Sequence, residues 1–241
     1  MLSILYQDSD VLAVDKPPGR VVIPDRARAG KSLREIVDDY LTAFGERGYV
    51  VHRLDRGTSG VVLFARSAAA HRALNLSFDR GEAEKGYLAL VEGDMSGEGT
   101  VDTALYPARR GRMRPAKKDE RGQPSLTRWK VLERFERLTW VELRPATGRS
   151  HQLRVHLKYI GHPLAFDPTY GRKTPLTACD LVPAVSSAGR RIVLQRTPLH
   201  ACWIRIPHPS GTGMLFVESP LPDDLKEALR LLRAAAPETE G

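Results

Sequence analysis

The apolar segments of this 241-residue chain are short, and this limits what the chain can fold into. VVLFA at 61–65 is among the longest of them, which is the length of a strand and far below the ~20 residues of a membrane-spanning helix. Strand-like segments dominate, helices are interspersed, and long helical crossovers are scarce. We therefore predict an α+β fold, with a mixed, largely antiparallel β-sheet core flanked by helices, in preference to a doubly wound parallel sheet.

Apolar residues at helical spacing predict four helices, at 32–44, 68–79, 150–161 and about 222–236. The first of them has a capping box formed by Ser32 and Glu35 and a stop signal at Gly45. Ser67 is the expected cap of the second, which Gly81 ends. Alternating segments predict strands in the first 15 residues, at 61–66 and 85–93, in an antiparallel pair at 127–134 and 138–145, and in a hairpin over 199–219.

The chain is basic, with 37 Lys and Arg against 29 Asp and Glu, hence a net charge of 37 − 29 = +8. This surplus is compatible with a polyanionic partner but is common in proteins that have none. The two cysteines, Cys179 and Cys202, cannot build a disulfide framework or a zinc ribbon, which favours a reducing compartment. The N-terminal MLSILYQDSD lacks the basic and apolar regions of a signal peptide. We expect a cytoplasmic protein with no membrane partner.

Two glycine patterns partly match phosphate-binding loops, but each lacks a glycine that its motif requires. GKS at 30–32 needs a glycine five positions before Gly30, where Asp25 stands. The pair Gly97 and Gly99 has Asp102 where a dinucleotide loop needs its third glycine. The chain contains neither HExxH nor a close set of histidines and cysteines, so we predict no metal site.

The segment HRLDRGTSG at 52–60 has one carboxylate, Asp55, between Arg53 and Arg56. Adjacent arginines favour the ionised form of a carboxyl group, which suits a nucleophile or a general base and not a general acid. By itself the segment is better explained as a surface ion pair that steadies a turn.

A second dense segment, TGRSHQLRVHL at 147–157, places Arg149, Arg154 and Lys158 on the helix side opposite Leu153 and Leu157. Such a face is ordinarily solvated. Its functional interpretation is that Arg154 is the ion-pair partner of a buried acid and that Arg149 binds phosphate.

Together these segments resemble the RluA family of RNA pseudouridine synthases. HRLDRGTSG is similar to that family's signature around its catalytic aspartate, and KGYLALVEG at 85–93 is similar to the segment that carries its active-site tyrosine, here Tyr87. By itself Tyr87 would be taken for a core tyrosine of a strand. Further similar segments, in the family's order over residues 1–217, are VLAVDKPPG at 11–19, TGRSHQLRVHLKYIGHPLAFDPTYG at 147–171 and LHACWIRIPHP at 199–209.

The resemblance implies a pseudouridine synthase fold with a central basic cleft, and isomerisation of uridine within RNA without a cofactor. The glycosidic bond breaks, the base rotates, and carbon 5 rejoins the sugar. Asp55 would be the essential acid, either as a nucleophile or as a base on a sugar proton. Arg154 would keep it ionised, Tyr87 would stack on the base and assist proton removal from carbon 5, and Arg53 would fill the space that the flipped base leaves.

Two departures from the family pattern are visible. After His162-Pro163-Leu164-Ala165 the chain has Phe166-Asp167, where the family has Gly-Asp, so we expect a different turn and assign Asp167 no role. We expect the small basic domain that precedes many relatives to be absent, because the first family-like strand starts within the first dozen residues, and the catalytic domain itself to hold RNA. We expect the basic loop 108–122, with seven Lys or Arg and two acids, to contribute. The candidate RNA contacts are Arg53, Arg56, Arg149, Arg109, Arg110 and Lys117.

The sequence thus predicts a single catalytic domain over 1–241, acting as a monomer on structured RNA, with tRNA favoured over rRNA. One alternative is a non-catalytic RNA-binding or RNA-folding protein on the same scaffold. A carboxylate-based glycosidase would need a second acid across the substrate, and none stands out.

Overall fold

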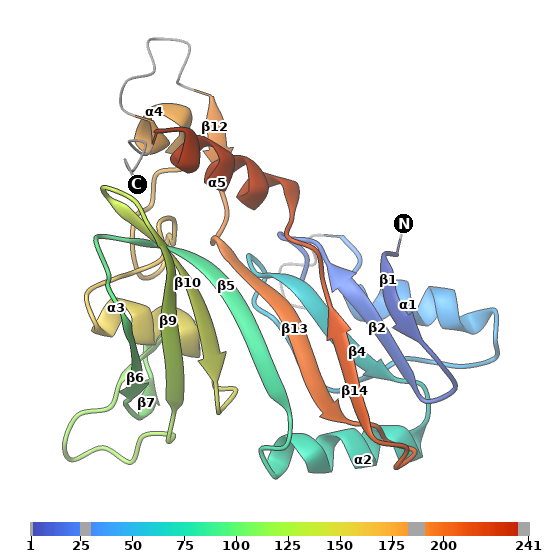
Figure 1. Ribbon diagram of the computed structural model, residues 1–241. Helices are drawn as coiled ribbons and strands as arrows, with labels where there is room; N and C mark the ends of the chain where they lie inside the picture. The colour runs from blue at the N-terminus through green and yellow to red at the C-terminus, as the bar shows by residue number, and fades with distance from the viewer. Residues whose placement is uncertain (1, 25–29, 183–190, 236–241) are drawn as a thin grey trace. The chain divides into compact units, whose positions relative to one another are not determined.

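A computed structural model describes residues 2–24, 30–182 and 191–235 (Figure 1). The chain forms two compact units, of which the first comprises Met1–Tyr87 and His200–Pro220 and the second Leu88–Leu199 and Leu221–Gly241. The expectation of one catalytic domain over 1–241 stays a prediction. So does the central basic cleft. The predicted last helix is present as far as Ala235, and position 236 lies outside the described residues.

The first unit is a curved sheet whose strands pair mainly antiparallel. β2 pairs antiparallel with β1 and β4, β3 with β4, and β14 with β13, whereas β4 and β13 run parallel at Ser59 and Gly60. The strands are β1 (Ile4–Gln7), β2 (Val11–Lys16), β3 (Tyr49–Val50), β4 (Ser59–Ala65), β13 (Leu199–Pro207) and β14 (Met214–Glu218).

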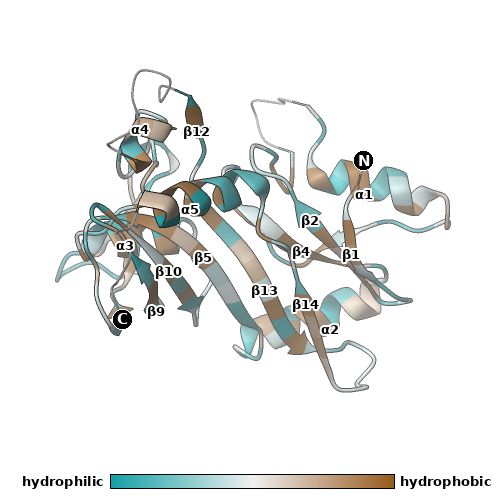
Figure 2. Ribbon diagram, turned by 45° about the horizontal axis from the view of Figure 1, so that its top comes forward, coloured by the Kyte–Doolittle hydropathy of each residue, from teal (hydrophilic) through white to brown (hydrophobic). Residues whose placement is uncertain are grey.

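Helices cover both faces of this sheet, which explains why β4 is buried along its whole length and apolar from Val61 to Ala65 (Figure 2). Val61 and Leu63 point into the core shared with α2 (Ala68–Asp79). Val62 and Phe64 point into the core shared with α1 (Leu33–Thr42). A strand buried on both faces reads as a continuous apolar run instead of an alternating one.

Both helices begin where the sequence predicts. The Ser32 hydroxyl accepts from the Glu35 backbone N–H, and the Glu35 carboxylate accepts from the Ser32 backbone N–H, which completes the capping box. Ser67 caps α2 by accepting from the Ala70 N–H. The capping predictions are confirmed because they depend only on local sequence.

The second unit has its own antiparallel core. β10 (Leu138–Pro145) pairs with β9 (Leu126–Arg134), which pairs with β6 (Glu98–Asp102), and β5 (Glu84–Glu92) brings the chain in from the first unit. Leu138 and Trp140 pack with α4 (Ala178–Leu181) and α5 (Asp223–Ala235) in one core. Thr127 bonds to α3 (Gln152–Tyr159). The predicted fold class, a mixed and largely antiparallel sheet flanked by helices, is confirmed.

The basic segment 108–122 is not a plain loop, as the sequence suggested. β7 (Leu105–Pro107) and β8 (Met113–Pro115) form an antiparallel hairpin around the short 3-10 turn η1 (Arg109–Gly111). Arg110 has a left-handed backbone with φ of 58°, which turns the chain at the tip. The two-residue β11 (Leu176–Thr177) and three-residue β12 (Ile192–Leu194) also escaped prediction, because such short strands leave no measurable periodicity.

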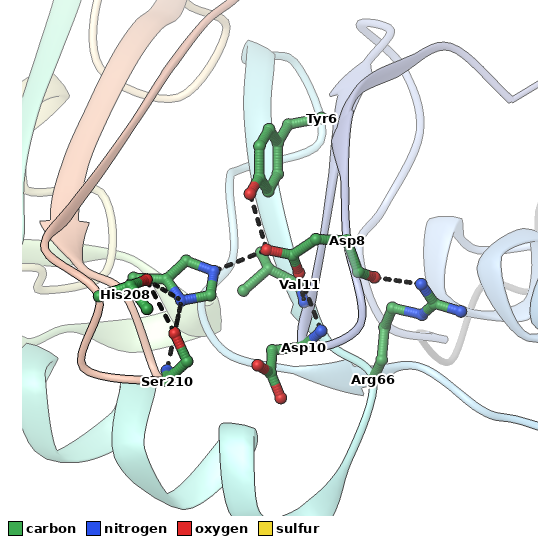
Figure 3. Close-up of polar contacts among 8 residues, drawn as sticks. Tyr6, Asp8, Asp10, Val11, Arg66, His208 and Ser210 are labelled. Atoms are coloured by element: carbon green, nitrogen blue, oxygen red, sulfur yellow. Dashed lines mark hydrogen bonds and ion pairs between the residues drawn. The ribbon is translucent and has the colours of Figure 1, made fainter.

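One polar cluster fixes the turn between β13 and β14 to the end of β1 (Figure 3). The Asp8 carboxylate accepts from the Tyr6 hydroxyl and from His208 Nε2, both at 2.7 Å. His208 Nδ1 in turn lies 2.6 Å from the Ser210 hydroxyl. Burial would raise the pKa of Asp8, but these bonds, with two backbone N–H donors, lower it to about 2. The carboxylate therefore stays charged and keeps the turn in place.

Candidate active site

A buried lysine stabilises the loop that carries Asp55. Lys16, the last residue of β2, is fully buried, and its ammonium donates to the backbone carbonyls of Pro17, Arg20 and Arg56 at 3.0, 2.7 and 3.2 Å. The Gly19 N–H also donates to the Arg56 carbonyl. The turn after β2 and the Asp55 loop are thus fixed to each other through one cation.

We expect Lys16→Met to destabilise the protein by about 3 kcal/mol, because three backbone carbonyls would lose the buried charged donor that they share. Urea unfolding followed by circular dichroism measures this. Lys31→Met is the matched control, since Lys31 forms a salt bridge with Asp39 in which both side chains are more than half exposed, and it should change stability little. Equal effects of the two substitutions would contradict the anchoring role of Lys16.

A glycine closes the other end of the loop. Gly60 has a φ of +114°, and a Cβ added to it would lie 2.1 Å from the Ala201 carbonyl oxygen. Only glycine allows both the backbone conformation and this approach. Next to it, the Ser59 hydroxyl and His200 Nδ1 lie 3.0 Å apart, and His200 Nε2 lies 3.2 Å from the Ser219 carbonyl. The strand after Asp55 is therefore fixed to β13.

Tyr87 on β5 lies near Asp55 within the first unit. Burial raises the pKa of the Tyr87 hydroxyl above its ordinary value of 10.0, and the negative charge of Asp55 adds to this, as does Cys202. The ring packs against the core that contains Leu54 and Val62. Tyr87 is therefore a neutral phenol at physiological pH, able to donate a hydrogen bond beside the Asp55 carboxylate.

The side chain of His52, three residues before Asp55, contacts β4 and α2. Its Nε2 accepts from the Leu63 backbone N–H at 3.1 Å, and its ring lies 5.3 Å from that of Phe78. Burial lowers the pKa of His52 from 6.5 to about 3, and the nearby Lys85 ammonium lowers it further. The imidazole is therefore neutral in the folded protein.

This pKa predicts acid sensitivity. The unfolded chain takes up a proton at His52 near pH 6.5 and the folded one only near pH 3, so stability present above pH 6.5 is lost as the pH falls through this window. The loss amounts to at most about 1.4 kcal/mol per pH unit. Urea unfolding between pH 7 and pH 4 should show this slope, and His52→Gln should reduce it. An unchanged slope in the variant would contradict a neutral His52.

In the second unit, Arg154 of α3 is buried, contrary to the solvated helix face that its spacing suggested. Its Nε and Nη2 donate to the two carboxylate oxygens of Asp167 at 2.7 and 2.8 Å, with the arginine 8% exposed and the aspartate 1%. Burial would raise the pKa of Asp167, but Arg154 and the N–H groups of Thr169 and Tyr170 outweigh it and hold this pKa below 3.8. The pair has the fork geometry that fixes a guanidinium in one orientation.

The sequence did not identify Asp167 as the partner of Arg154. Part of the reason is Phe166, which stands before it where the family has glycine. Phe166 is buried, and its φ is not positive. Among the described residues, the non-glycine residues with a positive φ are Arg110 and His151. The chain thus turns here without the glycine that the family has at this point. Asp167 closes the turn, since its N–H donates to the Arg172 carbonyl and its carbonyl accepts from the Gly171 N–H.

The remaining predicted residues are exposed, as contacts to a large substrate require. All six candidate RNA contacts lie at the surface: Arg53, Arg56, Arg149, Arg109, Arg110 and Lys117. Over residues 2–24, 30–182 and 191–235, no group of three His, Cys, Asp or Glu is arranged to hold a metal ion, and no helix is long and apolar enough to cross a membrane.

Solved structures define the class of protein. The human RNA pseudouridylate synthase domain containing 4 superposes with a TM-score of 0.77 at 24% identity, over 96% of this chain and 93% of that one. The human RNA pseudouridylate synthase domain containing 1 gives a TM-score of 0.70 at 28% identity, over 97% and 95%. The fold is that of RNA pseudouridylate synthases.

Sequence comparison places the chain within a family. A family model described as RNA pseudouridylate synthase matches residues 10–159, which include Asp55, Tyr87 and Arg154. Ribosomal large subunit pseudouridine synthase D of Nitrosomonas europaea is 36% identical, over 96% of this chain and 65% of that protein. Ribosomal large subunit pseudouridine synthase C of Salmonella typhi is 35% identical, over 97% and 70%. The chain belongs to the RNA pseudouridylate synthase family, as its resemblance to the RluA family predicted, and spans about two thirds of these relatives' length.

Proposed function

We propose that this protein isomerises uridine to pseudouridine in structured RNA, with Asp55 as its essential carboxylate. Family membership supports the reaction class. The observation that supports the choice of Asp55 is its setting: the loop is fixed by Lys16 on one side and by Gly60 on the other, and the Tyr87 phenol lies nearby. Such fixing holds a reacting group in one geometry, which is a main source of catalytic power.

The neutral state of Tyr87 restricts its part in the reaction. A phenol whose pKa is raised cannot take up the carbon-5 proton unless it gives up its own. Beside Asp55 it can do so only in a concerted step, in which its own proton passes to that carboxylate as it accepts the proton from carbon 5. Tyr87 therefore stacks on the base and donates a hydrogen bond, and Asp55 is the final proton acceptor, directly or through Tyr87. Whether Asp55 also attacks the sugar or the base is a separate question.

Arg154 is the third member of the proposed set. Its guanidinium is held by Asp167 in a fixed plane, and in this proposal it supports the negative charge of Asp55, which is the role that the RluA family assigns to an arginine at this position. The positive charge of Arg154 is permanent, so it serves as an electrostatic support and not as a proton donor.

We propose large-subunit ribosomal RNA as the substrate, because the two relatives described above are named for it. Transfer RNA, which the sequence favoured, is the alternative. A pseudouridine map of total RNA from cells with and without the gene tests both. A site lost from large-subunit rRNA supports the proposal, a site lost from tRNA redirects it, and an unchanged map contradicts the function. A non-catalytic RNA-binding protein would also leave the map unchanged.

RNA binding should weaken steeply with salt, because the contacts proposed are to phosphates. A plot of log affinity against log salt concentration should become shallower by about 1 when Arg109→Ala removes one phosphate contact. Fluorescence anisotropy with a labelled rRNA fragment measures the slope. Arg233→Ala is the control, since Arg233 is bound to Glu133 on the second unit. An equal slope in wild type and Arg109→Ala would remove the hairpin from the RNA-binding surface.

A further inference from the structure

Tyr170 is bonded at once to the basic hairpin, to the start of α3 and to the turn that holds Arg154. Its hydroxyl accepts from the Met113 backbone N–H at 2.8 Å and lies 2.8 Å from His151 Nδ1. The centre of its ring is 5.0 Å from the Arg154 guanidinium carbon. Its backbone N–H donates to Asp167 Oδ1 at 3.1 Å. No function proposed above uses this tyrosine.

The bonds of the Tyr170 hydroxyl join two elements. A backbone N–H can only donate, so the Tyr170 oxygen accepts from Met113. The same oxygen and His151 Nδ1 share a hydrogen bond whose direction depends on the histidine tautomer, and the two rings meet edge-on, at 78°. His151 has a φ of 55° and precedes α3, so the bond also fixes a strained residue where the helix begins.

The hairpin is packed onto α3 at the same point. Met113, the first residue of β8, forms one buried cluster with Leu105 of β7, Val155 of α3 and Tyr170. The tip beyond it carries the exposed Arg109 and Arg110. The charge of Arg114 is already neutralised by Glu120, through two bonds of 2.6 Å. The exposed charge of Arg109 and Arg110 is thus at the tip, three to four residues before Met113.

We propose that Tyr170 is a positioning residue that couples the basic hairpin to Arg154, so that phosphate binding at the tip favours the catalytic orientation of the guanidinium. The proposal rests on the proposed function. A displacement of β8 moves the Met113 N–H, and through the tyrosine ring it acts on the Arg154 and Asp167 pair. Because such coupling is reciprocal, the orientation of Arg154 also affects RNA affinity at the tip.

The test is a double-mutant cycle between Tyr170→Phe and the tip variant Arg109→Ala/Arg110→Ala. Phenylalanine keeps the packing and the ring under Arg154 and removes only the hydroxyl. Single-turnover tritium release from a carbon-5-labelled rRNA transcript, at saturating enzyme, gives the rate, and anisotropy gives the affinity. In a wild-type background the tip variant should weaken binding and slow the rate by about tenfold. With Tyr170→Phe it should weaken binding only.

Three further measurements make each outcome informative. Tyr159→Phe removes an exposed hydroxyl from α3 (the residue is 58% exposed) and should change neither the rate nor the affinity. Hydrogen exchange of the 105–115 peptide, without RNA, should be faster in Tyr170→Phe. If Tyr170→Phe lowers the melting temperature strongly, His151→Leu breaks the same chain of bonds. His151→Asn keeps a side chain that can hydrogen-bond to Tyr170 and tolerates a positive φ, so it should retain the coupling.

Different results would contradict the proposed function and the coupling through Tyr170. If wild-type protein forms no pseudouridine in any RNA, the proposed function is wrong. If wild-type protein is active and the effects of the two variants on the rate simply add, the coupling through Tyr170 is wrong. Unchanged exchange of the hairpin in Tyr170→Phe would also overturn it.

Discussion

Asp55→Asn is expected to abolish isomerisation, with a loss of at least ~10³-fold in rate, while RNA affinity changes less than about twofold. Asparagine has nearly the same shape as aspartate, so the loop fixed by Lys16 and Gly60 should keep its form. Its amide cannot act as a nucleophile or accept a proton at neutral pH. Tritium release from carbon-5-labelled RNA measures the rate, and anisotropy measures the affinity.

Two controls separate chemistry from folding in this experiment. Asp79→Asn removes an exposed carboxylate at the end of α2 and should leave the rate unchanged. The melting temperature of Asp55→Asn should match that of wild type. Normal turnover by Asp55→Asn would exclude Asp55 as the essential acid. Loss of affinity in parallel with the rate would instead show that the carboxylate organises the RNA-binding surface.

Local sequence was enough to predict much of the first unit. The caps at Ser32 and Ser67 were predictable because a cap involves only the next three residues. The apolar run of β4 predicted a strand, but only the structure shows why it has no polar face: helices cover both sides. Asp55 and Tyr87 were singled out by resemblance, since the residues around each are also compatible with a surface pair and a core tyrosine.

The second unit shows where sequence patterns fail. The spacing of α3 alone is that of a solvated face, because periodicity treats every arginine as exposed, and the prediction that Arg154 pairs with a buried acid did not identify which acid. The carboxylate that allows its burial, Asp167, lies in an irregular turn with no period to reveal it, and its bond to Arg154 spans 13 residues. The hairpin at 105–115 was hidden for a related reason: its strands have three residues each.

The Arg154 and Asp167 pair gives the second large effect. Asp167→Asn should destabilise the protein by about 3–5 kcal/mol, because it leaves a buried guanidinium without its counter-charge. Isomerisation should fall as well, since Arg154 would lose its fixed orientation. Urea unfolding and tritium release measure the two effects. Asp180→Asn, at the half-buried pair with Arg172, is the control and should cost much less.

A double replacement separates the two roles of this pair. Replacing both partners, as Arg154→Met with Asp167→Leu, removes the unpaired charge and should recover most of the stability, because buried ion pairs are often no better than apolar packing. Activity should stay lost, since no cation remains to support Asp55. If the double variant regained activity together with stability, the pair would be a packing device and Arg154 would leave the proposed catalytic set. If Asp167→Asn kept full activity, the orientation of the guanidinium would not depend on its carboxylate partner.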